Sequence, residues 1–282
     1  MQKKVLALHD LSGCGRSSLV PIISLLAAAG HECIPLPTAI FSTHTAIPGW
    51  VTTDLTSAMP GSIEQYDRLG LRFDAVYAGF LASAQQVEIV SEAIRRLKAL
   101  HGIALIDPVM GDNGKIYQTY TSEMCEKIQD LCMAADVITP NVTEAAILLG
   151  LSPTAKPKTM DEAIEWMRRL YERYRAAVVL TGLRFSPDDN NSIKVGCYTS
   201  DETKICQEPF VAGEYPGTGD IFAAVLLGRI LYGIPLPEAC VFAGAFVKDC
   251  IAYTAAQQTN PAYGIQFEKL LKNVIFSEEN LT

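Results

Sequence analysis

The sequence lacks the cysteine patterns of disulfide-stabilised and zinc-binding proteins. Its eight cysteines include no C-x-x-C pair, and they are scattered through apolar segments such as Ala239-Cys240-Val241. A disulfide framework or a structural zinc site requires closer and more regular spacing. The cysteines are therefore interpreted as buried free thiols of a cytoplasmic protein.

Long apolar runs and an excess of basic residues are also missing. No uninterrupted stretch of about 20 apolar residues is present, which is the length that a membrane-spanning helix needs. The first residues do not resemble a secretory signal, so we expect a cytoplasmic protein without membrane contact. The formal net charge is −8, which disfavours nucleic acid as a partner because its backbone is anionic as well.

Histidine is too sparse for several kinds of catalysis. The four histidines form neither a Ser/His/Asp set nor a cluster with metal-ligand spacing. This disfavours a hydrolase that uses a catalytic triad. His44 follows an expected strand, and we interpret it as structural because a lone histidine more often has that role.

The residues that are present predict one α/β domain. Hydrophobic residues make up 49% of the 282 residues, and short apolar strand-like segments alternate with helix-like ones. The expected strands cover 5–8, 33–41, 73–77, 103–106, 137–139 and 177–180. Such alternation is typical of right-handed βαβ crossovers around a mainly parallel sheet. No linker divides the chain, so we predict a single domain over 1–282, with 275–282 as a flexible tail.

Two details refine this expected sheet. The second expected strand contains Pro35 and Pro37, which predict a short or edge-like element. Near the end, a hairpin is expected from 193–199 and 203–211, and two apolar helices follow at about 219–232 and 236–256. Ligands of open parallel sheets bind beyond the carboxyl ends of the strands, so the polar residues that follow each strand are the site candidates.

A turn from Asp10 to Ser18 follows the first expected strand and contains Gly13 and Gly15. Its Gly13-x-Gly15 matches part of the dinucleotide-binding fingerprint, but the third glycine and the acidic residue at the end of the second strand are missing. This disfavours an NAD-dependent oxidoreductase. The turn does not match a Walker phosphate loop either, because Asp10 replaces the first glycine of that motif and Arg16 replaces its lysine. The turn is interpreted either as a helix start or as a turn that contacts substrate.

The segment Gly217-Thr218-Gly219-Asp220 lies where an apolar helix is expected to begin. The free N–H groups of a helix start, together with the helix dipole, form a site for anions. A carboxylate beside a phosphate is unfavourable unless it accepts the proton of an alcohol that attacks phosphorus. We therefore predict phosphoryl transfer to a hydroxyl group with Asp220 as general base. The alternative is an aspartate that only stabilises the helix dipole.

Two further groups of polar residues follow expected strands. Asp107 and Asp112 follow strand 103–106, and paired carboxylates suit magnesium because this ion takes few protein ligands. Asn141 and Glu144 follow strand 137–139 with the spacing of a capping box. Both groups have a purely structural alternative, as turn or cap residues.

Taken together, these motifs resemble the ribokinase-like superfamily and, within it, the pyridoxal kinase family. The matching segments are Phe41-Ser42-x-His44-Thr45, Asp107-Pro108-Val109-x-Gly111-Asp112, Ile138-Thr139-Pro140-Asn141-x-x-Glu144 and Gly217-Thr218-Gly219-Asp220-x-Phe222-Ala223-Ala224. The resemblance implies a three-layer α/β sandwich with a mainly parallel central sheet. It also implies ATP and Mg²⁺ as cofactors and a homodimer, and it leaves open whether a monovalent cation such as K⁺ is needed.

The resemblance assigns roles to individual residues. Asp220 is the expected base, and Gly217, Thr218 and Gly219 are the expected anion hole. Substrate binding is expected of Asp10, Ser12, Thr45, Phe80, Tyr117 and Asp220. ATP binding is expected of Asp107, Thr139, Asn141, Glu144, Thr181 and Gly219, with Asp107 and Glu144 also as metal ligands.

The expected reaction is the ATP-dependent phosphorylation of the 5′-hydroxymethyl group of pyridoxal, pyridoxine or pyridoxamine, in the salvage of pyridoxal 5′-phosphate. Many pyridoxal kinases place a serine just after the first strand, where this chain has Asp10. Related hydroxymethylpyrimidine kinases of thiamine biosynthesis carry an aspartate in this turn, so they stay an alternative. A non-catalytic vitamin-binding protein is a second alternative, although such a protein could dispense with Asp220.

Overall fold

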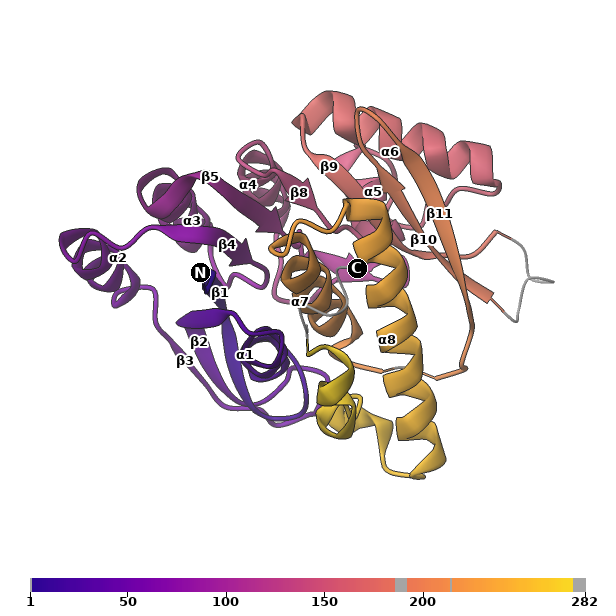
Figure 1. Cartoon of the computed structure of the whole chain (residues 1–282), viewed down its shortest axis with the longest axis horizontal. Helices are drawn as coiled ribbons and strands as arrows, with labels where there is room; N and C mark the ends of the chain where they lie inside the picture. Colours follow the sequence, from indigo (N-terminus) through magenta and orange to yellow (C-terminus); the bar gives the residue numbers. More distant parts are fainter. Residues whose placement is uncertain (1, 186–191, 214, 276–282) are drawn as a thin grey trace.

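One sheet of nine strands forms the centre of the computed structural model, which describes residues 2–185, 192–213 and 215–275 (Figure 1). The strand order is β11-β10-β9-β8-β5-β4-β1-β2-β3. The six strands from β9 to β2 pair in parallel, and β10, β11 and β3 pair antiparallel. The bounds are β1 Lys4–Cys14, β2 Glu32–Thr43, β3 Thr52–Asp54, β4 Phe73–Ala78, β5 Lys98–Ile106, β8 Val137–Ile138, β9 Ala177–Leu183, β10 Ser192–Tyr198 and β11 Thr203–Pro209. The predicted α/β fold and the predicted hairpin are confirmed.

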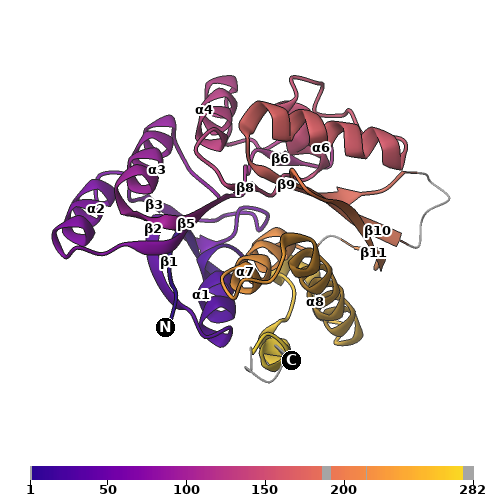
Figure 2. The same ribbon diagram turned by 45° about the horizontal axis from the view of Figure 1, so that its top comes forward.

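Helices cover both faces of the sheet and give the protein three layers (Figure 2). The helices on one face are α2 Met59–Arg68, α3 Ala84–Leu97, α4 Ser122–Cys132, α5 Val142–Leu148 and α6 Met160–Tyr174. The helices on the other face are α1 Leu19–Ala28, α7 Thr218–Ile230 and α8 Leu236–Ala256. Each helical layer packs against the sheet and encloses an apolar core. This arrangement is the predicted three-layer sandwich.

The side chains of the central strands alternate between these two cores. In β1, Leu6 and Leu8 belong to the core under α2–α6, whereas Val5 and Ala7 belong to the core under α1, α7 and α8. All four are fully buried. Successive side chains of a strand point to opposite faces, so a strand that is covered on both sides reads as a continuous apolar run. This is why the sequence pattern identified the central strands.

The second strand is longer than predicted. β2 runs over 12 residues and lies between β1 and β3. β3 pairs only with residues 39–41, so the stretch that contains Pro35 and Pro37 has β1 as its single partner. Prolines are tolerated where one side of a strand is open. Of the two alternatives, a short element is wrong, and an edge-like element is confirmed for the proline-containing half of β2.

Several short elements had no recognisable pattern in the sequence. They are α2, β3, the two-stranded pair β6 (Gly111–Asp112) and β7 (Lys115–Ile116), and the 3-10 turns η1 (Pro261–Tyr263) and η2 (Glu268–Asn273). The side chains of β3 and β7 are exposed, so neither strand shows the alternation that marks a half-buried strand. Residues 276–282, which make up most of the expected tail, lie outside the described residues.

By length and composition alone, α8 could cross a membrane. In this fold Ala239, Ala243 and Phe246 of α8 are buried in the core that α8 shares with α1 and α7. The core helix of an α/β domain meets the same criteria of length and apolarity, and we interpret α8 in that way.

The burial of Leu6 predicts a large loss of stability for Leu6→Ala. Leu6 is fully buried in the centre of the sheet, and truncation of a buried leucine costs about 2–5 kcal/mol because a cavity remains. Urea unfolding should report this loss as a lower midpoint. Leu100→Ala is the control, because that side chain is 91% exposed, and it should change the free energy of unfolding by less than about 0.5 kcal/mol. Equal effects of the two variants would contradict the assigned core.

Candidate active site

The predicted site residues gather at one edge of the sheet. Asp10 lies in β1, Phe80 and Asp107 follow β4 and β5, and Thr139 follows β8. These strands are parallel neighbours in the order β8-β5-β4-β1, so their carboxyl ends meet at the edge where ligands of such sheets bind. Residues from separate motifs therefore share one rim.

The N-terminus of α7 reaches the same edge. Gly217 has φ +85°, a left-handed conformation that favours glycine. A Cβ atom at this position would collide with the carbonyl oxygen of Arg16, so any side chain would push away the turn between β1 and α1. A Cβ atom at Gly219 would lie 3.8 Å from Oδ2 of Asp107. The free N–H groups of this helix start and the Asp107 carboxyl are therefore close neighbours.

Asp220 lies in the first turn of α7 and contacts the turn between β1 and α1. Its Oδ2 accepts a hydrogen bond of 2.7 Å from the N–H of Ser18. Burial raises the pKa of Asp220 to about 7, and the charges of Asp107 and Asp10 act in the same direction, whereas the bond from Ser18 lowers the pKa. A carboxyl group with a pKa near neutral pH suits a general base.

Asp107 and Glu144 are buried carboxyl groups with interacting charges. Burial raises the pKa of Asp107 to about 7, and burial together with the charge of Asp107 raises the pKa of Glu144 well above its usual value. Thr139 Oγ1 donates a bond of 3.1 Å to Asp107 Oδ1. Glu144 accepts bonds from the N–H groups of Met110 at 3.1 Å and Asn141 at 2.9 Å. Nearby positive charge would favour the ionised form of both groups.

These two carboxyl groups fit a magnesium ion. Mg²⁺ takes oxygen ligands in proteins and is commonly held by one or two carboxylates together with water and substrate phosphates. Within the residues that the structure describes, no group of three or more His, Cys, Asp or Glu side chains could hold a metal ion. An ion beside Asp107 and Glu144 would therefore take its remaining ligands from phosphate and water.

Asp10 and Ser12 are buried and hydrogen-bonded to each other. Ser12 Oγ donates to Oδ2 of Asp10 at 2.8 Å, and Ser18 Oγ donates to Oδ1 at 2.6 Å. Burial raises the pKa of Asp10, whereas these hydroxyl bonds lower it. The two oxygens of a carboxylate can accept about four bonds, so the two hydroxyl bonds leave Asp10 with capacity for a further donor.

Phe80, Tyr117 and Thr45, which are predicted to bind substrate, follow β4, β7 and β2. Phe80 packs edge-on against Phe41 and Tyr120, with ring centroids 6.0 Å and 5.9 Å apart. Tyr117 directly follows the β6–β7 pair, and 42% of it is exposed. Thr45 is exposed in the turn after β2. Their contact with a substrate ring stays a prediction.

His44 makes contacts that agree with the structural role predicted for it. Its Nε2 lies 2.5 Å from the carbonyl oxygen of Ala262. Its ring also fills the space beside Gly15, where a Cβ atom would collide with it. His44 therefore links the C-terminal segment to the turn between β1 and α1.

Asn141 and Thr181 connect the end of β8 to β9 on the predicted ATP side. Backbone pairing joins the two residues, and Asn141 forms the predicted capping box with Glu144 at the start of α5. The side-chain nitrogen Nδ2 of Asn141 donates a bond of 2.8 Å to the carbonyl oxygen of Gly111. The capping prediction is confirmed, and the cap also holds the loop that carries Asp107. Contact with ATP stays a prediction.

Two residues near Asp220 were not singled out from the sequence. Tyr77 is fully buried in β4, and its pKa is raised by burial and by the charges of Asp107 and Asp220. It is part of an apolar strand and gives no sequence signal of its own. Ser18 lies in the glycine-containing turn after the first strand, which is a candidate site from the sequence. Its bond to Asp220 spans 202 residues, and no local pattern predicts such a contact.

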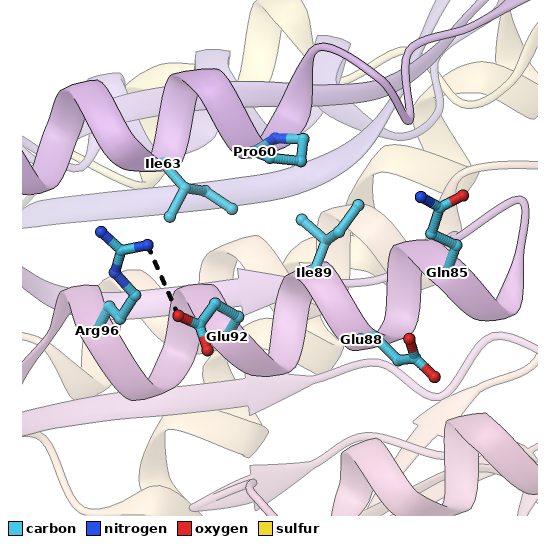
Figure 3. A pocket seen from close by; sticks show the side chains of 7 residues that line it. All are labelled: Pro60, Ile63, Gln85, Glu88, Ile89, Glu92 and Arg96. Atoms are coloured by element: carbon cyan, nitrogen blue, oxygen red, sulfur yellow. Dashed lines mark ion pairs between the residues drawn. The ribbon is translucent and has the colours of Figure 1, made fainter.

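The groove between α2 and α3 is distinct from this site (Figure 3). It has a volume of about 300 Å³ and is lined by Pro60, Ile63, Gln85, Glu88, Ile89, Glu92 and Arg96. Arg96 pairs with Glu92 at 3.6 Å, and none of the predicted site residues lines the groove. We interpret it as a gap between two surface helices.

Comparisons with known proteins identify the family. The model of the phosphomethylpyrimidine kinase family matches residues 64–264. A Bacteroides thetaiotaomicron protein named as a phosphomethylpyrimidine kinase, crystallised with pyridoxal, is 36% identical with a TM-score of 0.92, and the match covers 97% of this chain and 96% of that one. Pyridoxal kinase of Lactobacillus plantarum is 28% identical with a TM-score of 0.88 and 97% coverage of each chain. Pyridoxal kinase PdxY of Pseudomonas entomophila is 28% identical over 80% of this chain and 79% of its own length.

The chain therefore belongs to the phosphomethylpyrimidine kinase family, which is ribokinase-like. Within this family of vitamin kinases it is pyridoxal kinase-like, and its fold is that of the pyridoxal kinase structures.

The raised pKa of Asp220 predicts that Asp220→Asn stabilises the protein more at pH 8 than at pH 5. The folded-state pKa of about 7 lies above the ordinary value of 3.8. Between these values the folded state keeps a proton that the unfolded state has lost, so stability falls as the pH rises through this range. Asp220→Asn has no carboxyl group at this position, so its stability does not fall with pH for this reason. Urea unfolding at both pH values measures the difference.

Asp161→Asn is the matched control for this measurement, because Asp161 is an exposed carboxylate in the first turn of α6. It should change stability by the same amount at both pH values. A gain from Asp220→Asn that does not depend on pH would contradict a buried, titrating carboxyl group at this position.

Proposed function

We propose that this protein transfers the γ-phosphoryl group of ATP to the 5′-hydroxymethyl group of pyridoxal, pyridoxine or pyridoxamine. The main support is the placement of Asp220, a carboxyl group in the first turn of α7, beside a glycine-rich anion site and near Asp107. A carboxylate there repels phosphate. It suits a residue that accepts a proton from the attacking hydroxyl.

In the proposed reaction, Asp220 takes the proton of the substrate hydroxyl while the hydroxyl oxygen attacks the γ-phosphorus. The N–H of Ser18 binds Oδ2 of Asp220, which leaves Oδ1 to face the substrate. The N–H groups of residues 217–220 stabilise the charge that spreads over the equatorial oxygens of the phosphoryl group. The bond from the γ-phosphorus to its bridging oxygen breaks, and ADP leaves.

Asp107 and Glu144 are the residues that would hold Mg²⁺, directly or through water. A bound ion offsets the charge of the β- and γ-phosphates. Thr139 keeps Asp107 oriented through its hydroxyl bond, and the capping box keeps Glu144 in place. We place the ATP phosphates and the nucleotide along Gly219, Thr139, Asn141 and Thr181.

Vitamin B6 is the proposed substrate because the relatives point to it. The 36% identical structure contains pyridoxal, and two further relatives are named as pyridoxal kinases. Phe80 offers an aromatic surface to a planar ring, and Thr45 and Tyr117 are the other proposed substrate contacts. Asp10 with Ser12 offers acceptors to a ring or amino N–H. A hydroxymethylpyrimidine would suit the same acceptors, and the matching family is named for the pyrimidine substrate. Hydroxymethylpyrimidine kinase is therefore the second candidate function.

Two other properties rest on the family resemblance alone. Homodimer formation and a role in pyridoxal 5′-phosphate salvage stay predictions on this ground, and the need for K⁺ stays open. The cytoplasmic location stays a prediction from the cysteine pattern and the first residues of the sequence. A non-catalytic vitamin-binding protein is disfavoured, because such a protein has no need for both a glycine anion site and a buried base.

Asp220→Asn should lower kcat by about 10²-fold or more, because a general base contributes about 10²–10⁴-fold. The protein should still fold, since asparagine can accept the Ser18 bond through its amide oxygen. Steady-state kinetics with ATP, Mg²⁺ and pyridoxal measure the effect. Asp161→Asn, the same change in the first turn of α6, should keep full activity. Near-normal turnover of Asp220→Asn would show that Asp220 only stabilises the helix.

A substrate panel separates the two candidate functions. Pyridoxal, pyridoxine, pyridoxamine and hydroxymethylpyrimidine should each be tested with ATP and Mg²⁺, and we expect the B6 vitamers to be phosphorylated with the higher kcat/KM. Phosphorylation of the pyrimidine alone would refute the vitamin B6 assignment and keep the kinase assignment. Binding of all four compounds without any turnover would instead favour a vitamin-binding protein.

A further inference from the structure

Ser18 has a backbone conformation that residues with a side chain rarely adopt. Its φ and ψ angles are 54° and −132°. Such a conformation costs free energy and persists only where the surroundings enforce it, often at functional sites. Glycine would adopt it more readily. A serine at this position therefore implies that its hydroxyl group has a specific role.

The hydroxyl of Ser18 does not cap the helix that it precedes. Ser18 is the N-cap residue of α1, yet its side chain makes no capping hydrogen bond. The N-cap residues of α3, α4 and α6, which are Ser83, Thr121 and Thr159, have extended backbones and do cap their helices. The hydroxyl of Ser18 donates instead to Oδ1 of Asp10 at 2.6 Å.

The backbone N–H of the same residue binds the proposed base. It lies 2.7 Å from Oδ2 of Asp220, and a bond from an N–H group to a carboxylate is among the stronger kinds of hydrogen bond. Ser18 therefore connects two carboxyl groups, Asp10 through its hydroxyl and Asp220 through its backbone. Only 8% of Ser18 is exposed, so water competes little for either bond.

The turn that carries Ser18 is held from both sides. The carbonyl oxygen of Arg16 packs against Gly217, and Arg16 Nε forms a 2.5 Å ion pair with Glu268. Ser12 donates to the other oxygen of Asp10. Asp10 is thereby a fixed anchor, and the position of the Ser18 N–H depends on it.

We propose that Ser18 is a positioning residue for Asp220. Its hydroxyl bond to Asp10 holds the unusual backbone conformation, and the backbone N–H then orients the Asp220 carboxyl so that Oδ1 faces the substrate hydroxyl. The inference rests on the proposed role of Asp220 as base. Ser18 itself acts through Asp220 and not on the substrate.

Kinetics of Ser18→Ala and Ser18→Gly test this role, with Ser24→Ala as the matched control. Ser24 lies in α1, and its hydroxyl donates a bond of 3.0 Å to the carbonyl oxygen of Val20 in the same helix. Both Ser18 variants should lower kcat about 10-fold with a smaller change in KM, since a displacement of about 1 Å can cost up to about 10²-fold. Ser24→Ala should match the wild type. Ser18→Gly relieves the backbone strain, so it provides the test if Ser18→Ala does not fold.

A double-mutant cycle distinguishes positioning from a general loss of structure. If Ser18 acts through Asp220, Ser18→Ala should cause no further loss of kcat in the Asp220→Asn background, because residues in one network are not additive. An equal loss in both backgrounds would overturn the proposal. Wild-type kcat in Ser18→Gly would also overturn it, because the hydroxyl would then be unnecessary.

A measurement without turnover keeps this inference separate from the proposed function. In the ¹H–¹⁵N spectrum of serine-labelled protein, the Ser18 amide proton should lie downfield, as expected for a short bond to a carboxylate. It should move upfield in Asp220→Asn and in Asp10→Ala, and stay in place in Ser24→Ala. An unchanged signal in Asp10→Ala would refute the link between Asp10 and Ser18. Absence of phosphorylation by the wild type would refute the proposed function and leave this result intact.

Discussion

The close contact between Gly217 and the carbonyl oxygen of Arg16 is the constraint on which the site depends. It needs the small size of glycine and a left-handed φ angle. The contact joins the turn after the first strand to the start of α7, which are far apart in the chain. Because of it, the free N–H groups of α7, the carboxyl of Asp220 and the ends of the central strands face one another.

The electrostatics of the site follow from this packing. Burial raises the pKa values of Asp10, Asp107, Glu144 and Asp220, and repulsion adds to the effect for Asp220 and Glu144. Buried carboxyl groups without nearby positive charge are unfavourable in their ionised form. Burial therefore favours the protonated forms at this edge, and a bound cation would favour the ionised forms that a general base requires.

The sequence predicted those features that depend on local pattern. The central strands were recognisable because both of their faces are buried, and the capping box of Asn141 and Glu144 was recognisable from its spacing. The length of β2 could not be recognised from the sequence, since its prolines lie where the strand has an open side. The bond from Ser18 to Asp220 could not be recognised either. It depends on a backbone conformation and on a tertiary contact, and neither has a sequence signature.

The substrate question centres on Asp10, which replaces the serine of many pyridoxal kinases. In this fold Asp10 is engaged with Ser12 and Ser18, so it serves the shape of the turn as well as any ligand. A carboxyl group accepts a bond from a ring N–H when it is ionised and can donate to a ring nitrogen when it is protonated. Asp10 is therefore compatible with a pyridine and with a pyrimidine. If Phe80, Thr45 and Tyr117 contact the substrate as proposed, discrimination between the two rings would depend on how each ring packs against them.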